Sequence, residues 1–296
     1  MLHVVEPGLR STVQDDPRVA GARIGLPGSG PADPLAFAAA RALAGEPAAA
    51  VIEVVGLPFT FRCDDRRLLA VTGRDVSVRA SSRLPGWMAF VARAGETVTV
   101  LGGSRYAYVC VGGGLALEPV LGSRATYLPA RVGPLPRALA AGDAIPLGPA
   151  RGLERAGQRV PAARYVAPVE AIAGPHAERF ERDAARAFFA EEFSVGSEAD
   201  RMGVRLAGPE LRWPHADVLT CGVLPGAVQV PRGGSPIVLG PDAQTTGGYP
   251  VIAVVAAASR GIVAQALPGE RLRFAPVDPA RAVAALRAAG AGSAVA

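Results

Sequence analysis

The chain has 296 residues, of which half are hydrophobic and 27 are proline, so it is long enough for two domains and favours short strands over long helices. All 31 positions counted as lysine or arginine are arginine, and the absence of lysine excludes a Walker-type nucleotide loop, a Schiff-base enzyme and a covalently biotinylated carrier. The net charge of +5 comes from scattered arginines without a basic stripe, so nucleic acid is not an expected partner.

The first elements frame a loop rich in glycine and proline. Residues 2–5 have the pattern of a strand, whereas the segment 25–33 holds too many glycines and prolines for a regular element. Asp33 can cap a helix whose first residue is Pro34, and Gly45 can end that helix. The sequence therefore predicts a helix between these residues, and capping explains Asp33 better than catalysis does.

A run of short strands follows the helix. Proline, glycine and aspartate punctuate the apolar segments at a spacing typical of a barrel or sandwich. The predicted strands cover 51–55, 59–62, 68–71, 76–79, 87–92, 97–101 and 106–111. Turns of one form precede three strands along the chain, and we expect positive φ at their glycines, which are Gly95, Gly142 and Gly269.

Fewer elements are predicted in the rest of the chain. The span 112–159 is rich in turns, and a strand is predicted at 166–172. A helix is predicted from His176 to about Glu192, with apolar residues along one face. A further helix over 279–289 begins with proline after an aspartate cap.

The two halves of the chain repeat a pattern. The segment 52–61 has a loose echo in 204–213, which indicates two related β units. We therefore expect a mainly β fold with a few helices. Its first β subdomain would cover 1–155 and its second 156–277, followed by a C-terminal helix and tail over 278–296.

Cysteine and histidine are scattered. The three cysteines lack a CxxC pair, which favours reduced thiols in a cytoplasmic protein; they are Cys63, Cys110 and Cys221. The three histidines lack metal-binding spacing, so no metal site is expected; they are His3, His176 and His215. The longest apolar runs are too short to cross a bilayer, and we expect no membrane partner.

The segment 236–250 is the main candidate site. An apolar run leads into polar residues and a second apolar run, 251–255, leads away from them. The polar residues offer a carboxylate, an amide and two hydroxyls; they are Asp242, Gln244, Thr245 and Thr246. Gly247 and Gly248 allow the loop to curl and a ligand to approach the backbone. The alternative is an ordinary capped turn.

Two other groups are candidates for binding anions. Gly112, Gly113 and Gly114 follow a strand directly, so their amides could hold a developing oxyanion, with a plain tight turn as the alternative. Arg201 could bind a substrate carboxylate through its guanidinium fork. The alternative is a surface salt bridge to Asp200 or Glu198.

Several segments together resemble a known family over nearly the whole chain. They are 12–15, 29–33, 111–114, 121–123, 197–203, 226–231 and 242–250. The chain resembles the biotin-dependent carboxyltransferase-like family, which includes the C-type component of bacterial 5-oxoprolinase, also called allophanate hydrolase subunit 2, and the Kip antagonist. Two departures are Val204, where the family has an aromatic residue, and Gly240-Pro241, where it has a more apolar pair.

The resemblance implies two cyclophilin-like β-barrel subdomains and a role in ATP-dependent hydrolysis of 5-oxo-L-proline to L-glutamate. The protein would act with 5-oxoprolinase subunits A and B, with ATP and Mg in the assembled complex and no biotin on this chain. Two other functions remain open. One is the carboxyltransferase component of a urea carboxylase or allophanate-type system, and the other is a non-enzymatic regulator that antagonises a Kip-type kinase inhibitor.

Opening a lactam requires a group for the substrate carboxylate, donors for the lactam oxygen and a base for water. We expect Arg201 to bind the carboxylate, and the amides of 112–114 to act on the oxygen with Thr245 and Thr246. We expect Asp242 to act as the base or to orient a metal-bound nucleotide. Gln244 and Tyr249 would position the substrate.

Overall fold

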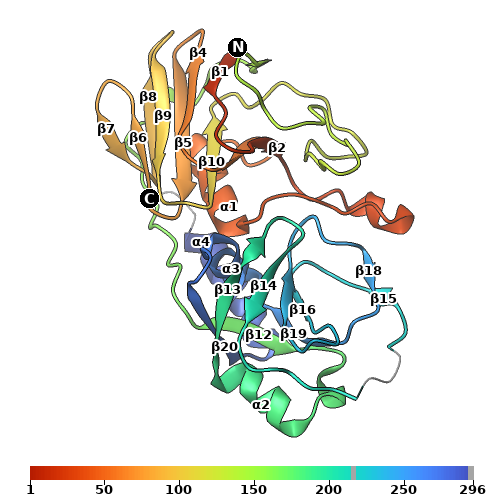
Figure 1. Cartoon of the computed structure of the whole chain (residues 1–296). Coiled ribbons are helices and arrows are strands. Elements are labelled where there is room, and N and C mark those ends of the chain that lie inside the picture. The colour runs from red at the N-terminus through yellow and green to blue at the C-terminus, as the bar shows by residue number, and fades with distance from the viewer. Residues whose placement is uncertain (215–217, 293–296) are drawn as a thin grey trace. The chain divides into compact units, whose positions relative to one another are not determined.

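The computed structural model describes residues 1–214 and 218–292, and its contacts divide the chain into two units (Figure 1). The first unit comprises Met1–Ala20, Ser29–Ala163 and 289–292, and the second comprises Gly21–Gly28 and Arg164–Ala288. The segment 156–163, which the sequence-based division gave to the second subdomain, packs with the first unit. The amide of Val160 there donates to the carbonyl of Trp87.

The first unit contains two antiparallel sheets. The six-stranded sheet has the order β11-β1-β4-β9-β6-β7, with β1 (Leu2–Glu6), β4 (Phe59–Cys63), β6 (Val76–Arg79), β7 (Arg83–Pro85), β9 (Thr97–Gly102) and β11 (Ala144–Ile145). The five-stranded sheet has the order β2-β3-β10-β5-β8, with β2 (Thr12–Gln14), β3 (Val51–Val55), β5 (Arg67–Gly73), β8 (Met88–Ala92) and β10 (Tyr106–Val111). Every residue of β5 and β10 is buried, which explains why both strands are almost continuously apolar.

Helix α1 (Pro34–Ala44) packs against β5 and β10 (Figure 1). The Asp33 carboxylate accepts from the amide of Ala36 at 3.2 Å, and Gly45 ends the helix with φ of 70°. The predicted helix and both of its caps are confirmed. The preceding loop is held by the buried Glu53 carboxylate, which accepts from the amide of Ala32 at 2.9 Å. This ties the segment 29–33 to the core of the sheet.

The second unit contains a closed barrel with the strand order β12-β19-β16-β17-β14-β13-β20. Its strands are β12 (Val169–Ala173), β13 (Glu192–Ala199), β14 (Gly203–Ala207), β16 (Ala227–Gln229), β17 (Ile237–Leu239), β19 (Val251–Val255) and β20 (Arg271–Pro276). A separate two-stranded ribbon joins β15 (Cys221–Gly222) to β18 (Thr246–Gly247). The core includes Phe188 of α2 (Arg182–Ala190), whose ring stacks on that of Phe274 with centroids 4.5 Å apart. The mainly β fold is confirmed, with barrel closure in the second unit and two sheets in the first.

The remaining elements are helices and short turns. In the described part of the chain they are α3 (Arg260–Gln265), α4 (Pro279–Gly292) and 3-10 turns at Val19–Ile24, Leu153–Arg155, Ala177–Arg179 and Ala257–Ser259. The Asp278 carboxylate accepts from the amide of Arg281 and caps α4 as predicted. Residues 293–296 of the predicted tail lie outside the described residues. The predicted positive φ at the three turn glycines is confirmed, with values of 72° at Gly95, 90° at Gly142 and 85° at Gly269.

The continuous helix predicted from His176 to Glu192 is wrong. The chain forms the 3-10 turn Ala177–Arg179, becomes extended at Phe180, and starts α2 only at Arg182. The amide of Glu181 donates to the carbonyl of Arg212 at 3.2 Å, a bond to a distant segment. Tertiary hydrogen bonding therefore overrides the helical periodicity here.

Candidate functional site

The loop after β17 is fastened by backbone bonds near both of its ends. The amides of Gly240 and Asp242 donate to the carbonyls of Met202 and Arg201, each at 2.9 Å. The carbonyl of Thr245 accepts from the amide of Val223 at 3.0 Å, next to the pairing of β15 with β18. The loop predicted as the site is therefore held in a defined conformation.

Arg201 and Asp242 form a bidentate ion pair. Nε of Arg201 lies 2.7 Å from Oδ2 of Asp242, and Nη2 lies 2.9 Å from Oδ1. Both residues are buried, with 8% and 5% of their surface exposed. The sequence analysis gave these side chains separate roles as a carboxylate clamp and a base, whereas the structure joins them to each other. A Cβ at Gly240 would clash with the Arg201 carbonyl oxygen, so the loop needs glycine at that point.

Gln229 is a buried residue that the sequence analysis did not select as a site residue. Its Oε1 accepts from Nε2 of Gln244 at 3.1 Å, whereas its own Nε2 is buried and has no hydrogen-bond partner within the described segments. A Cβ at Gly247 would lie 2.5 Å from that nitrogen, so the glycine makes the close approach possible. A polar residue inside the apolar segment 227–230 was the signal that could have identified it, because buried polar groups normally need partners.

The remaining loop side chains face solvent to different degrees. Gln244, Thr246 and Tyr249 are exposed and Thr245 is half-buried. Of these side chains, Gln244 contacts the buried Gln229 amide. Thr245 and Thr246 directly precede Gly247, whose backbone lies close to that amide. The structure brings together all the predicted site residues of the segment 242–249 within one unit.

The glycine triplet belongs to the first unit, and its amides already have acceptors in the protein. The amides of Gly112 and Gly114 each donate at 2.8 Å, to the carbonyls of Leu68 and Val111. The amide of Gly113 donates at 2.7 Å to the carboxylate of Glu46. This geometry gives no support to the predicted anion cradle and agrees with the alternative, a tight turn.

The Glu46 carboxylate lies where the sequence analysis expected a bound anion, beside the amide of Gly113. This carboxylate receives Nε and Nη2 of Arg151 at 2.6 and 2.5 Å. Burial opposes the ionisation of Glu46, but Arg151 and the amide of Gly113 outweigh that effect and hold the pKa of the carboxyl below its usual value. The amide of Gly113 therefore donates to the protein's own Glu46 carboxylate and is not available to a ligand.

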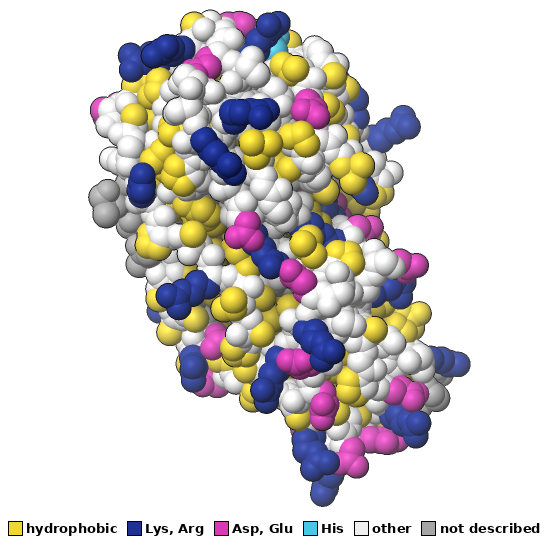
Figure 2. Space-filling view, turned by 60° about the vertical axis from the view of Figure 1, so that its left-hand side comes forward, with side chains coloured by type: hydrophobic (Ala, Val, Ile, Leu, Met, Phe, Trp, Pro, Cys, Tyr) yellow, Lys and Arg dark blue, Asp and Glu magenta, His cyan; other side chains and the backbone are white. Residues whose placement is uncertain are grey.

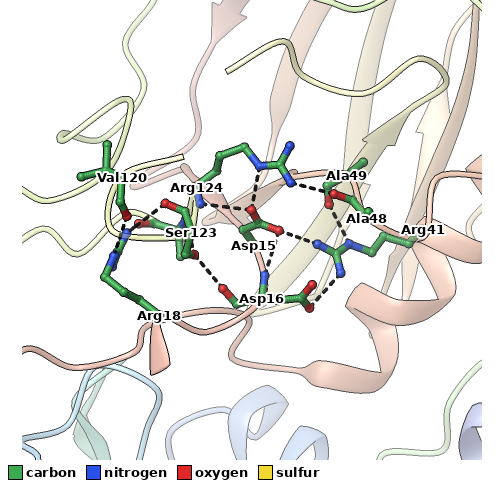
Figure 3. A network of polar contacts seen from close by, with 10 residues as sticks. Asp15, Asp16, Arg18, Arg41, Ala48, Ala49, Val120, Ser123 and Arg124 are labelled. Carbon is green, nitrogen blue, oxygen red and sulfur yellow. Dashed lines mark hydrogen bonds and ion pairs between the residues drawn. The ribbon is translucent and has the colours of Figure 1, made fainter. Parts of the chain in front are cut away.

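A network of charges centred on the buried Asp15 and Arg41 fixes the N-terminal segment of the first unit (Figure 3). Asp15 accepts from Arg41 and from Arg124, each at 2.7 Å, and Asp16 accepts from Arg41 at 2.9 Å. Arg18 donates through Nε and Nη2 to backbone carbonyls of the segment 120–125. These contacts give Asp15 a structural role and fasten the backbone of the segment 120–125 to Arg18.

The described residues contain no cluster of three or more His, Cys, Asp or Glu side chains that could hold a metal ion. His215 lies outside the described part of the chain. Within that part, no helix combines the length and apolar character needed to cross a bilayer. On the face shown in Figure 2, arginine and acidic side chains are interspersed and form no continuous basic stripe.

Comparison with known proteins places these features in a family. The profile of the carboxyltransferase domain, subdomains A and B, matches residues 24–276. The C-type 5-oxoprolinase component of Escherichia coli K12 is 34% identical over 282 residues, which cover 93% of this chain and 90% of that protein. The urea amidolyase of Saccharomyces cerevisiae is 27% identical over 94% of this chain but only 17% of its own length.

The fold has a close counterpart among solved structures. The urea amidolyase of K. lactis superposes with a TM-score of 0.91 over 99% of this chain and 20% of its own, at 24% sequence identity, a likeness that concerns the fold. The profile match and the similarity to a bacterial 5-oxoprolinase component over nearly its whole length show that the chain belongs to the carboxyltransferase domain family, subdomains A and B.

Proposed function

We propose that this chain is the C-type component of an ATP-dependent 5-oxoprolinase that hydrolyses 5-oxo-L-proline to L-glutamate together with A and B subunits in the cytoplasm. The observation that carries the proposal is the 34% identity to the C-type 5-oxoprolinase component of Escherichia coli over 90% of that protein's length. A match over almost the whole of both chains favours a shared role more than a match to a small part of a larger enzyme does.

The loop of the second unit supplies groups suited to a lactam. Breaking the amide resonance places negative charge on the lactam oxygen, and fixed neutral donors stabilise such charge. The buried Nε2 of Gln229, on β16, lacks a partner among the described residues. Thr245 and Thr246 directly precede Gly247, whose backbone lies close to that nitrogen. We assign these three residues to the lactam oxygen. Gln244 and Tyr249, both exposed, position the substrate.

We assign Arg201 and Asp242 a positioning role. Two short charge-assisted hydrogen bonds hold each side chain in place, and separating a buried pair costs several kcal/mol. A base must be within reach of the attacking water, and Asp242 is engaged by the guanidinium on both of its oxygens. The pair fixes the start of the loop that carries the donor groups.

The described residues of this chain offer no phosphate loop of the Walker type for ATP. The chain has no lysine for a phosphate loop, and the amides of Gly112, Gly113 and Gly114 are bonded to protein oxygens. We therefore assign the nucleotide and its Mg to another member of the complex. No biotin is attached here, since that linkage needs a lysine amine.

A carboxyltransferase function is the second candidate. It is favoured by the similarity to yeast urea amidolyase over 94% of this chain. In that case a separate chain would carry the biotin, and the Gln229 amide would face a urea-like acceptor.

The test is glutamate release from 5-oxo-L-proline and ATP by the purified chain with its A and B partners. Release that stops when this chain is omitted supports the proposal. A complete, assembled complex that releases no glutamate but transfers carboxylate from a biotinylated carrier to urea would replace it with the second candidate.

A further inference from the structure

Arg260, the first residue of α3, differs from the other arginines with buried nitrogen atoms. Its Nε is buried without a hydrogen-bond partner, and its guanidinium makes no ion pair within the described part of the chain. Arg201 is matched by a carboxylate, and Arg18 by three backbone carbonyls. Arg260 has neither kind of partner.

The surroundings of Arg260 make its unpaired charge unfavourable for the stability of the fold. Burial lowers the pKa of the guanidinium, and no charge in residues 1–214 and 218–292 offsets the effect. A cation that is partly removed from water without a counter-charge destabilises the fold. An unmatched buried charge of this kind is typical of a binding site, where the ligand supplies the missing partner.

The position of Arg260 connects it to the candidate site. Its stem packs on Gly226, where an added Cβ would lie 3.4 Å from Cδ of the arginine, and Gly226 has a φ of +94°. The amide of Gly226 donates at 2.8 Å to the carbonyl of Leu239, the last residue of β17. The loop 240–248 begins at the next residue, so Arg260 lies beside the end of the strand that leads into the site.

We propose that Arg260 binds the carboxylate of the small-molecule substrate. This proposal rests on the function proposed above, because 5-oxo-L-proline carries one carboxylate and one lactam. The planar fork of arginine matches a carboxylate with two parallel hydrogen bonds, whereas the Gln229 amide suits a neutral carbonyl. Arg260 thus takes the role that the sequence analysis gave to Arg201, whose fork is already occupied.

The test compares Arg260→Met with Arg287→Met, a control that removes an exposed arginine from α4. Methionine keeps an unbranched apolar stem and removes the charge. Binding of labelled 5-oxo-L-proline, and of 2-pyrrolidone, which lacks the carboxylate, is measured on the chain assembled with its partners. Thermal unfolding is measured on the chain alone.

We expect Arg260→Met to weaken the binding of 5-oxo-L-proline by roughly 10- to 100-fold, as for other hydrogen bonds to charged groups. Binding of 2-pyrrolidone is expected to stay unchanged, and the melting temperature to rise, because an unmatched charge is removed. The control is expected to behave like the wild type. Loss of stability together with equal weakening for both ligands would show a structural role and overturn the proposal.

Two outcomes separate this proposal from the function on which it rests. If 5-oxo-L-proline binds selectively through Arg260 but no glutamate is released, the carboxylate site is supported and the 5-oxoprolinase function is contradicted. Glutamate release with the same KM in the wild type and in Arg260→Met would retain the function and overturn the role of Arg260.

Discussion

The two units treat their buried polar groups differently. In the first unit, Asp15 is shared by two arginines, and Glu46 takes both the Arg151 guanidinium and the amide of Gly113. In the second, Nε2 of Gln229 and Nε of Arg260 are buried and have no hydrogen-bond partner among the residues that the structure describes. Polar groups that bond to each other stabilise the fold, whereas donors without a partner in the protein can still bond to a ligand.

The contrast is not absolute. Nη1 of Arg18 and Oγ of Ser29 in the first unit are also buried without partners in the part of the chain that the structure describes. Arg18 nevertheless uses its other nitrogen atoms on three carbonyls, which makes it a link between two segments of its own unit. What distinguishes the second unit is that unmatched donors lie next to a loop with exposed polar side chains.

Asp15→Asn should have the largest effect on stability. It removes the charge that neutralises Arg41 and Arg124, and losing one partner of a buried ion pair costs about 3–5 kcal/mol. Urea unfolding of the full chain measures this loss. The matched control is Asp183→Asn, whose side chain is 89% exposed and should change stability by less than about 0.5 kcal/mol. Equal stability of both variants would contradict the structural role of the network.

Asp242→Asn tests whether a matched pair in the second unit supports the site. We expect the free energy of unfolding to fall by about 3 kcal/mol and glutamate release to fall with it, because the loop loses its anchor. Glu198→Gln, at a surface pair with Arg205, is the control and should leave both quantities unchanged. A stable but inactive Asp242→Asn variant would instead favour the original assignment of Asp242 as a base.

Gln229→Leu should separate activity from stability. Removing one donor to a developing oxyanion lowers kcat by about 100-fold, while an apolar side chain of similar size should be tolerated in the barrel. Kinetics of the assembled complex give kcat, and thermal unfolding gives stability. Gln158→Leu removes another glutamine that has a buried unpartnered atom, Oε1, outside the site, and should keep full activity. Equal loss of activity in both variants would contradict the special role of Gln229.

Glu46→Gln should have the smallest effect, and the effect should depend on pH. The pKa of Glu46 is lowered on folding, so its contribution is present above the usual value of 4.5 and is lost as the pH falls through the lower folded value. The variant should be less stable by about 1 kcal/mol at neutral pH and should converge with the wild type in acid. Unfolding midpoints across this range measure the difference, and parallel curves would contradict the ion pair with Arg151.

Local signals in the sequence predicted a large part of the fold. Asp33, Pro34 and Gly45 defined α1, and the three turn glycines have the predicted backbone conformation. These features depend on neighbouring residues alone. The helix predicted across Phe180 and Glu181 was wrong because a bond to Arg212 interrupts it, and no local pattern contains that information.

The site was predictable as a segment but not as a set of pairings. The loop 236–250 stood out by composition, and the structure places its polar residues together. Arg201 and Asp242 are 41 positions apart in the sequence. Their ion pair therefore could not be predicted from the residues around either of them. Similarly, the amides of Gly112 and Gly113 donate to Leu68 and Glu46, which are distant in the sequence, so these acceptors became identifiable only in the folded chain.

The most direct test is chemical-shift mapping of the isotopically labelled full chain with 5-oxo-L-proline. The unmatched donors of the second unit should respond, so we expect shifts in the side-chain amide of Gln229 and in the Nε–H of Arg260, with Gln229→Leu and Arg260→Met assigning the signals. The Nε–H of Arg18 in the first unit should stay in place. Shifts confined to the first unit would contradict the assignment of the site to the loop after β17.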